Sequence, residues 1–165
     1  MTGTIYQINV SLGGVPKRPV PETELTFSGL VGDKQKHLEF HGGPDRAICL
    51  YSYERILELQ REGHSMIPGS IGENVTIAGL DWSEIQPGVK LQLGDEAIVE
   101  ITKPAVPCKS IAAYFADENF VRISDKLYPG WSRFYARVLQ PGNLIVGQKV
   151  RLVEALTSQA IGLSL

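Results

Sequence analysis

The stretch KLQLGDEAIVEIT, residues 90–102, decides the fold of this chain. Lys90 to Leu93 and Ala97 to Thr102 have the composition of short strands, and they flank Gly94-Asp95-Glu96. Because the glycine can adopt a positive φ, this segment predicts a hairpin whose two strands pair antiparallel. Ala47 to Tyr51 is apolar at every position, which predicts a strand that is covered on both faces and lies centrally in the sheet.

Turn-forming residues also divide the rest of the chain into short segments. Its 17 glycines and 10 prolines divide the sequence into short apolar runs and leave no linker, low-complexity block or repeat. Further strands are predicted at Thr4 to Val10, Leu25 to Phe27, Asn74 to Ile77, Arg133 to Leu139 and Lys149 to Val153. Short strands along the whole of a single domain, residues 1–165, favour a mainly β fold. We expect a closed or partly open β-barrel of mostly antiparallel strands with a few peripheral helices.

Helices are predicted at three places. Tyr53 to Glu62 has amphipathic spacing, Ser52 can cap its N-terminus, and Gly63 can end it. A second helix is expected to open near Ser110 and to run through Tyr114 and Phe115. A third is expected over Glu118 to Leu127.

The composition excludes several classes of function. The net charge of −2 provides no global field for nucleic acid or for an anionic membrane, so an anion site must be a local cluster of cations. No apolar stretch is long enough for a spanning helix, and the first residues, MTGTIYQINV, lack the pattern of a secretory leader. We therefore expect a cytoplasmic protein. Phosphate-loop, dinucleotide, serine-elbow, kinase and iron–sulfur motifs are also absent from the sequence.

The two cysteines differ in their surroundings. Cys108 follows a predicted strand and precedes a predicted helix, with Lys103 and Lys109 nearby. Cations and the N–H groups of a helix start favour a thiolate, which predicts a nucleophile or a metal ligand; the alternative is a buried structural thiol. Cys49 lies in an unbroken apolar strand, so it is expected to be a core residue and to serve as a control for Cys108.

The segment HGGPDR, residues 41–46, predicts an anion site. Gly42 and Gly43 allow close approach of the backbone, and Arg46 offers a planar fork for phosphate or carboxylate. The alternative is a tight loop in which Asp45 pairs with Arg46.

His37 and His41 form an H-x-x-x-H pair. The glycines that follow argue against a helix and no third ligand is evident, so solvated or loop-anchoring histidines are preferred to a zinc site.

Two further segments carry polar groups at strand ends. In PGSIGEN, residues 68–74, Glu73 and Asn74 can project into a cleft, or the segment is a plain turn with a bulge. Arg133, Tyr135 and Arg137 alternate along one strand and share a face, which must meet either water or an anionic ligand.

Together these motifs resemble, in order and spacing, the MOSC domain, the module at the C-terminus of molybdenum cofactor sulfurases, and especially its stand-alone bacterial YiiM-type members. The resemblance spans about residues 1–155 and rests on five segments: GLVGD (29–33), HGGPDRA (41–47), PGSIGEN (68–74), Pro107-Cys108 and YARVL (135–139). It implies a β-barrel that holds a molybdenum cofactor in a cationic cleft. It also implies that Cys108 is a molybdenum ligand or sulfur carrier, and that residues 41–46 with Glu73 and Asn74 line the site.

Electrostatics add Lys103, Lys109, Arg133 and Arg137 to this expected site. The chain departs from the family pattern at Ala105, where relatives often carry arginine. Either one cation is missing from the cleft or Lys103 or Arg133 replaces it.

Three functions remain open at this point. The first is a molybdenum-dependent reductase of N-hydroxylated small molecules, with electrons from an external donor. The second is a sulfur carrier that holds a Cys108 persulfide and is loaded by a sulfur donor protein. The third is a non-catalytic cofactor-binding module.

Overall fold

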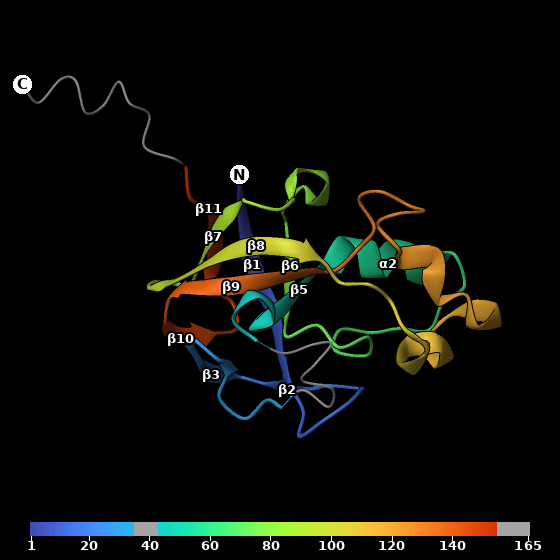
Figure 1. Cartoon of the computed structure of the whole chain (residues 1–165), viewed down its shortest axis with the longest axis horizontal. Coiled ribbons are helices and arrows are strands. Elements are labelled where there is room, and N and C mark those ends of the chain that lie inside the picture. The colour runs from blue at the N-terminus through green and yellow to red at the C-terminus, as the bar shows by residue number, and fades with distance from the viewer. Residues whose placement is uncertain (35–42, 155–165) are drawn as a thin grey trace, which may run out of the picture.

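The computed structural model describes residues 1–34 and 43–154, and its main element is a closed barrel (Figure 1). The strands of the ring pair in the order β11-β7-β8-β9-β5-β6-β1, and β1 also pairs with β11, which closes it. Their bounds are β1 (Thr2–Val10), β5 (Ile48–Ser52), β6 (Val75–Ala78), β7 (Lys90–Leu93), β8 (Ala97–Pro104), β9 (Phe134–Gln140) and β11 (Lys149–Leu152). The β5–β6 pair is parallel, and the other pairs of the ring are antiparallel. The predicted barrel is confirmed.

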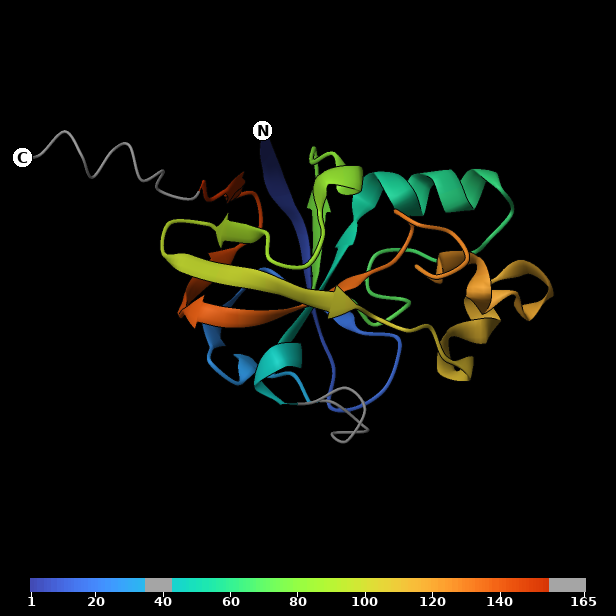
Figure 2. The same ribbon diagram turned by 45° about the horizontal axis from the view of Figure 1, so that its top comes forward.

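The hairpin of β7 and β8 forms as the sequence predicts. Lys90 pairs with Glu100 and Leu93 pairs with Ala97 across it. Its alternate side chains Leu91, Leu93, Val99 and Ile101 are buried inside the barrel, because successive residues of a strand point to opposite faces. Figure 2 shows β8 lying alongside β9, with which it makes the next antiparallel pair.

Strand β5 is the central strand that its apolar run predicts. All five of its residues are buried, and it pairs with β9 on one side and β6 on the other. The other predicted strands also form, with ends that differ from the expected ones by up to three residues.

Three short strands were not predicted: β2 (Arg18–Val20), β4 (Gly29–Leu30) and β10 (Gly142–Ile145). Proline or glycine in each masks the strand pattern, and each has only two to four residues. β2 extends the barrel sheet beside β1. β4 and β10 flank β3 (Glu22–Thr26) in a second sheet of order β10-β3-β4, whose Leu25 and Leu144 are buried.

The predicted helix is α2 (Tyr53–Arg61), which begins directly after β5. Ser52 caps it, since its Oγ accepts a hydrogen bond from the Arg55 N–H at 3.1 Å. Ile56 and Leu59 point into the core. In Figure 1, α2 lies on one side of the barrel together with the turns that follow β8.

The other two predicted helices do not form as α-helices. That region contains short 3-10 turns: η3 (Lys109–Tyr114), η4 (Ala116–Glu118) and η5 (Phe120–Ile123). Extended backbone at Phe115 (φ −111°) and a positive φ at Asp117 (56°) interrupt any continuous helix. Two further turns are η1 (Pro44–Arg46) and η2 (Trp82–Glu84). Within residues 1–34 and 43–154, none of the helices has the length and apolar content needed to span a bilayer.

Candidate functional site

A cavity of about 420 Å³ lies where the ends of β5, β6 and β9 meet the loops that follow β1 and β8. Its lining divides into two parts. The barrel wall consists of residues within or next to strands: Cys49, Asn74, Arg133 and Tyr135. The loop wall consists of Gly13, Gly14, Val15, Lys17, Lys34, Cys108, Ser110 and Ile111, and the turn residues Ile71 and Gly72 join the two.

Cys108 is the partly exposed thiol of the loop wall. It directly precedes η3, but its side chain makes no hydrogen bond to the N–H groups of that turn. Instead its Sγ lies 2.8 Å from the Ser110 Oγ. The expectation that a helix start holds this sulfur is therefore wrong, because only a six-residue 3-10 turn follows it.

Arg133 is the cation of the barrel wall, and only 7% of it is exposed. Its Nη1 donates to the Ile71 carbonyl at 2.7 Å. Among the described residues its buried Nε has no hydrogen-bond partner. A buried guanidinium N–H without an acceptor is costly, so this group is suited to an anion in the cavity.

The two residues before Arg133 are hydrogen-bonded to the core, and this fixes the position of Arg133 in the cavity wall. The Tyr51 hydroxyl donates to the Trp131 carbonyl at 2.7 Å, and Trp82 Nε1 donates to the Ser132 carbonyl at 2.8 Å. Since both donors belong to the buried core, the backbone that leads into β9 is held in one position.

Asn74 lines the cavity, but its side-chain amide already makes hydrogen bonds within the protein. Its Oδ1 accepts from the Cys49 N–H at 2.9 Å. Its Nδ2 donates to the Asn9 carbonyl at 3.3 Å and to Asp33 Oδ2 at 2.9 Å. Asn74 therefore ties β1, β5 and the Asp33 loop together and shapes the cavity.

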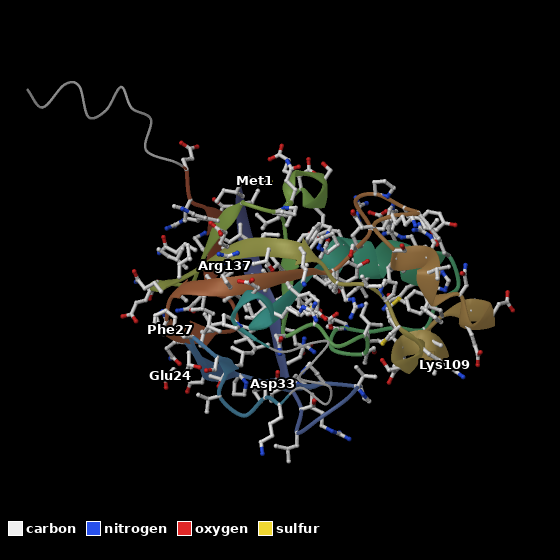
Figure 3. All side chains as sticks on the ribbon, viewed as in Figure 1. Met1, Glu24, Phe27, Asp33, Lys109 and Arg137 are labelled. Carbon is white, nitrogen blue, oxygen red and sulfur yellow. The ribbon has the colours of Figure 1, made fainter. Side chains whose placement is uncertain are left out.

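Lys17 and Lys34 are cavity cations that the sequence analysis did not select. Lys17 Nζ lies 2.6 Å from Asp33 Oδ1 and both side chains are buried, so the charge of Lys17 is largely compensated. Lys34 is exposed. Figure 3 labels Asp33 on the side of the molecule where β2 lies. A sequence pattern could have identified this loop. Gly13-Gly14 is followed by Lys17, just as Gly42-Gly43 is followed by Arg46.

Glu73 is fully buried behind the cavity and is not among its lining side chains. Its Oε1 accepts a hydrogen bond from the Gly69 N–H, and its Oε2 has no partner among the described residues. Burial raises the pKa of the Glu73 carboxyl to about 8, against the lowering effects of the Gly69 N–H and of the Arg133 charge.

The other predicted site residues lie elsewhere. Lys103 on β8 and the exposed Lys109 are not part of the described lining, although Lys109 is next to Cys108. Arg137 lies further along β9, with its side chain 44% exposed, and is 3.4 Å from Asp45 and 3.6 Å from Glu100. Figure 3 shows Arg137 on the barrel and Lys109 on the opposite side of the molecule.

The segment of residues 41–46 is described in part. His41 and Gly42, like His37, lie outside the described residues. Gly43 precedes η1, which contains Asp45 and Arg46. The guanidinium carbon of Arg46 lies 5.7 Å from the centre of the ring of Tyr135, which lines the cavity, while Arg46 is not among the described lining residues.

Cys49 is buried, as its apolar strand predicts, yet it also lines the cavity. It packs with Ala105 and Tyr135 in a small cluster of buried residues. Burial raises the pKa of the Cys49 thiol to about 11 and that of Tyr135 to about 12. At neutral pH both groups are therefore uncharged.

The donor set suits an anionic cofactor that carries a soft metal. Cys108 offers an accessible sulfur, which favours metals that accept thiolate ligands. Arg133 offers a buried N–H that is without a partner in residues 1–34 and 43–154, and glycine backbone at 13–14 and 72 lets a ligand approach closely. A Cβ at Gly72 would lie 3.2 Å from Val15 Cγ1, and its φ of 93° disfavours other residues.

Comparisons with known proteins agree with this architecture. Residues 37–151 match the model of the MOSC domain family, a family that is associated with binding of the molybdenum cofactor. "Uncharacterized protein YflK" of Bacillus subtilis is 32% identical over 142 residues, which is 85% of this chain and 63% of that protein. A protein named "Reductase" from Gibberella moniliformis is 25% identical over 132 residues, 77% of this chain and 23% of that protein.

Protein YiiM of Escherichia coli is similar in both sequence and structure. It is 29% identical over 145 residues, 85% of this chain and 63% of that protein. The crystal structure of YiiM from Escherichia coli matches with a TM-score of 0.70 and 25% identity, over 94% of this chain and 72% of that one. The chain thus spans less than two thirds, 63%, of the length of YflK and of YiiM. The chain belongs to the MOSC domain family.

Proposed function

We propose that the protein binds the molybdenum cofactor in this cavity and reduces N-hydroxylated small molecules in the cytoplasm. The observation that carries the proposal is that an accessible thiol, Cys108, lines the same cavity as Arg133, a buried arginine with one N–H that has no partner among the described residues. The similarity to a protein named "Reductase" supports the redox part of it.

Each wall has its own task in this proposal. Cys108 would ligate the metal, and the Ser110 hydroxyl 2.8 Å away would orient its sulfur. Arg133 and the exposed Lys34 would bind the phosphate of the cofactor, since a planar guanidinium and an ammonium both pair with phosphate oxygens. Val15, Ile71 and Ile111 would exclude water from the interior of the cavity. When bound, the cofactor supplies a redox centre that accepts and donates electrons in pairs.

The overall reaction breaks the N–O bond of the substrate. It consumes two electrons and two protons, and it releases the amine and water. The chain lacks a nicotinamide, flavin or iron–sulfur motif, so a separate reductase would supply the electrons. We propose no role for nucleic acid or membranes as partners.

The experiment compares the two cysteines as a matched pair. Wild type, Cys108→Ser and Cys49→Ser are purified from a host that makes the cofactor. Molybdenum content is then measured, together with reduction of an N-hydroxylated nucleobase by a chemically reduced viologen dye. We expect wild type and Cys49→Ser to contain molybdenum and turn over, and Cys108→Ser to lose turnover. Metal-free wild type would overturn the proposal, and bound molybdenum without turnover would leave a non-catalytic binding module.

Sulfur transfer is the second candidate, and the partial exposure of Cys108 favours it. A thiol that a partner protein can reach can accept a sulfur atom as a persulfide. After incubation with a cysteine desulfurase and cysteine, mass spectrometry would detect one additional sulfur on Cys108 and none on Cys49. Absence of this adduct on a protein that still binds molybdenum would exclude the carrier function.

A further inference from the structure

Glu73 and Arg133 are two buried ionisable side chains held by one turn. Arg133 Nη1 donates to the Ile71 carbonyl, and Glu73 Oε1 accepts from the Gly69 N–H. The Ile71 carbonyl and the Gly69 N–H both belong to the turn of residues 69–73, which precedes β6. The guanidinium lines the cavity and the carboxyl lies behind it.

Each of these side chains also has one unused polar atom. Arg133 Nε and Glu73 Oε2 are buried and have no hydrogen-bond partner in the described part of the chain. Arg133 and Glu73 form no direct ion pair in the described part of the chain, but both bind the same turn, and the positive charge of Arg133 lowers the pKa of the Glu73 carboxyl. A negative charge on Glu73 therefore competes with any anion in the cavity for the positive charge of Arg133.

We propose that Glu73 sets the anion affinity of the cavity through Arg133. While the carboxyl is neutral, the charge of Arg133 is available to an anion. Once the carboxyl ionises, it compensates that charge and the anion binds more weakly. Glu73 is a positioning residue in this scheme, since it acts through Arg133 and is not part of the cavity lining.

In residues 1–34 and 43–154, the groups that act on Glu73 or share its surroundings are the following. Lys17 faces the same turn, but its charge is paired with Asp33 at 2.6 Å. Burial raises the pKa of Cys49 to about 11 and raises that of Tyr51 further, so both stay neutral. Lys34, Tyr135 and Cys108 lie in the cavity walls, and Cys108 is tested separately below.

The sign of the effect follows from linkage. Burial raises the pKa of Glu73 to about 8, so the carboxyl is mostly protonated at pH 7. An anion that prefers the protonated form must raise this pKa further when it binds. Anion affinity must therefore fall as pH rises through about 8.

The test uses sulfate, whose charge is constant over this pH range, and protein free of cofactor. Calorimetry measures sulfate binding by wild type, Cys108→Ser and Glu73→Gln from about pH 6 to pH 9.5. We expect affinity to fall on the order of tenfold in wild type and in Cys108→Ser. Glu73→Gln should bind with the same affinity at every pH. Failure of wild type to bind sulfate, or the same pH dependence in Glu73→Gln, would overturn the inference.

A second measurement covers the case in which Glu73→Gln does not fold. The carboxyl carbons of glutamate are labelled with carbon-13 in wild type, and their NMR shifts are followed against pH. One carboxyl should titrate near pH 8, and sulfate should move its midpoint upward. A midpoint that sulfate leaves in place would reject the coupling.

The inference rests on the proposed function only for the identity of the natural anion, the phosphate of the cofactor. The two can fail separately. A pH-dependent sulfate site in a chain that never binds molybdenum would reject the function and keep the role of Glu73. Molybdenum binding with pH-independent sulfate affinity would keep the proposed function and reject the role of Glu73.

Discussion

The two walls of the cavity carry similar residue types in different physical states. The barrel wall has a thiol and a cation, Cys49 and Arg133, that are 5% and 7% exposed. The loop wall has a thiol and a cation, Cys108 and Lys34, that solvent can reach. The contrast teaches that the position in the fold, and not the residue type, decides whether a thiol or a cation of this cavity is buried or accessible to solvent.

The largest expected difference between the walls is in thiol reactivity. With a pKa of about 11, Cys49 forms almost no thiolate at pH 7.5, and burial also blocks access to it. We expect iodoacetamide to label Cys108 on the order of a thousandfold faster than Cys49. Peptide mass spectrometry of a time course measures both rates in one sample.

Cys108→Ser and Cys49→Ser serve as the matched controls for this measurement. Wild type and Cys49→Ser should label at the same fast rate, and Cys108→Ser should react only slowly. Labelling of Cys49 before Cys108 would mean that the two walls are not different in the way that burial indicates.

The next difference concerns the two cations. Arg133→Met removes a buried charge whose Nε has no partner in the part of the chain that the structure describes, so sulfate affinity at pH 6 should fall roughly tenfold to a hundredfold. Lys34→Met removes an exposed charge and should lower affinity by less than about threefold. Calorimetry measures both, with thermal unfolding as the check that each variant folds.

Arg137→Met is the remote control for the cation variants. Its side chain is 44% exposed and pairs with Asp45 and Glu100 outside the cavity, so sulfate affinity should not change. Equal losses in Arg133→Met and Lys34→Met would contradict a special role for the buried cation.

A further effect is expected on stability. The Glu73 pKa rises from 4.5 to about 8 on folding, so the folded chain holds a proton that the unfolded chain has released. Stability contributed by this group is present below about pH 4.5 and is lost as pH rises towards about 8. Glu73→Gln lacks this loss, so between pH 5 and pH 9 it should gain several kcal/mol relative to wild type, since each pH unit up to about pH 8 corresponds to about 1.4 kcal/mol.

Urea unfolding of both proteins at several pH values measures this difference. Glu24→Gln, which removes an exposed carboxyl from β3, is the matched control and should follow wild type at every pH. A constant offset between Glu73→Gln and wild type would show that the carboxyl is charged throughout.

Local patterns predicted most of the barrel. The hairpin of residues 90–102, the apolar strand at 47–51 and the capped helix after Ser52 each depend on neighbouring residues, and the structure contains all three. The strands β2, β4 and β10 escaped prediction, since each is short and contains proline or glycine; β10 in addition pairs with β3, more than 100 residues away in the chain.

The sequence by itself determined the kind of fold and identified Cys108, Asn74 and Arg133, which share one cavity in the structure. Only the tertiary structure decided that Lys17 and Lys34 lie there while Lys103 and Arg137 do not, that Cys49 lines the cavity, and that Glu73 is buried behind it. The reason is that the exposure and pairing of a charge depend on contacts between distant segments. Arg133 and the Ile71 carbonyl, for example, are 62 residues apart in the chain, and spacing along a sequence carries no information about such a contact.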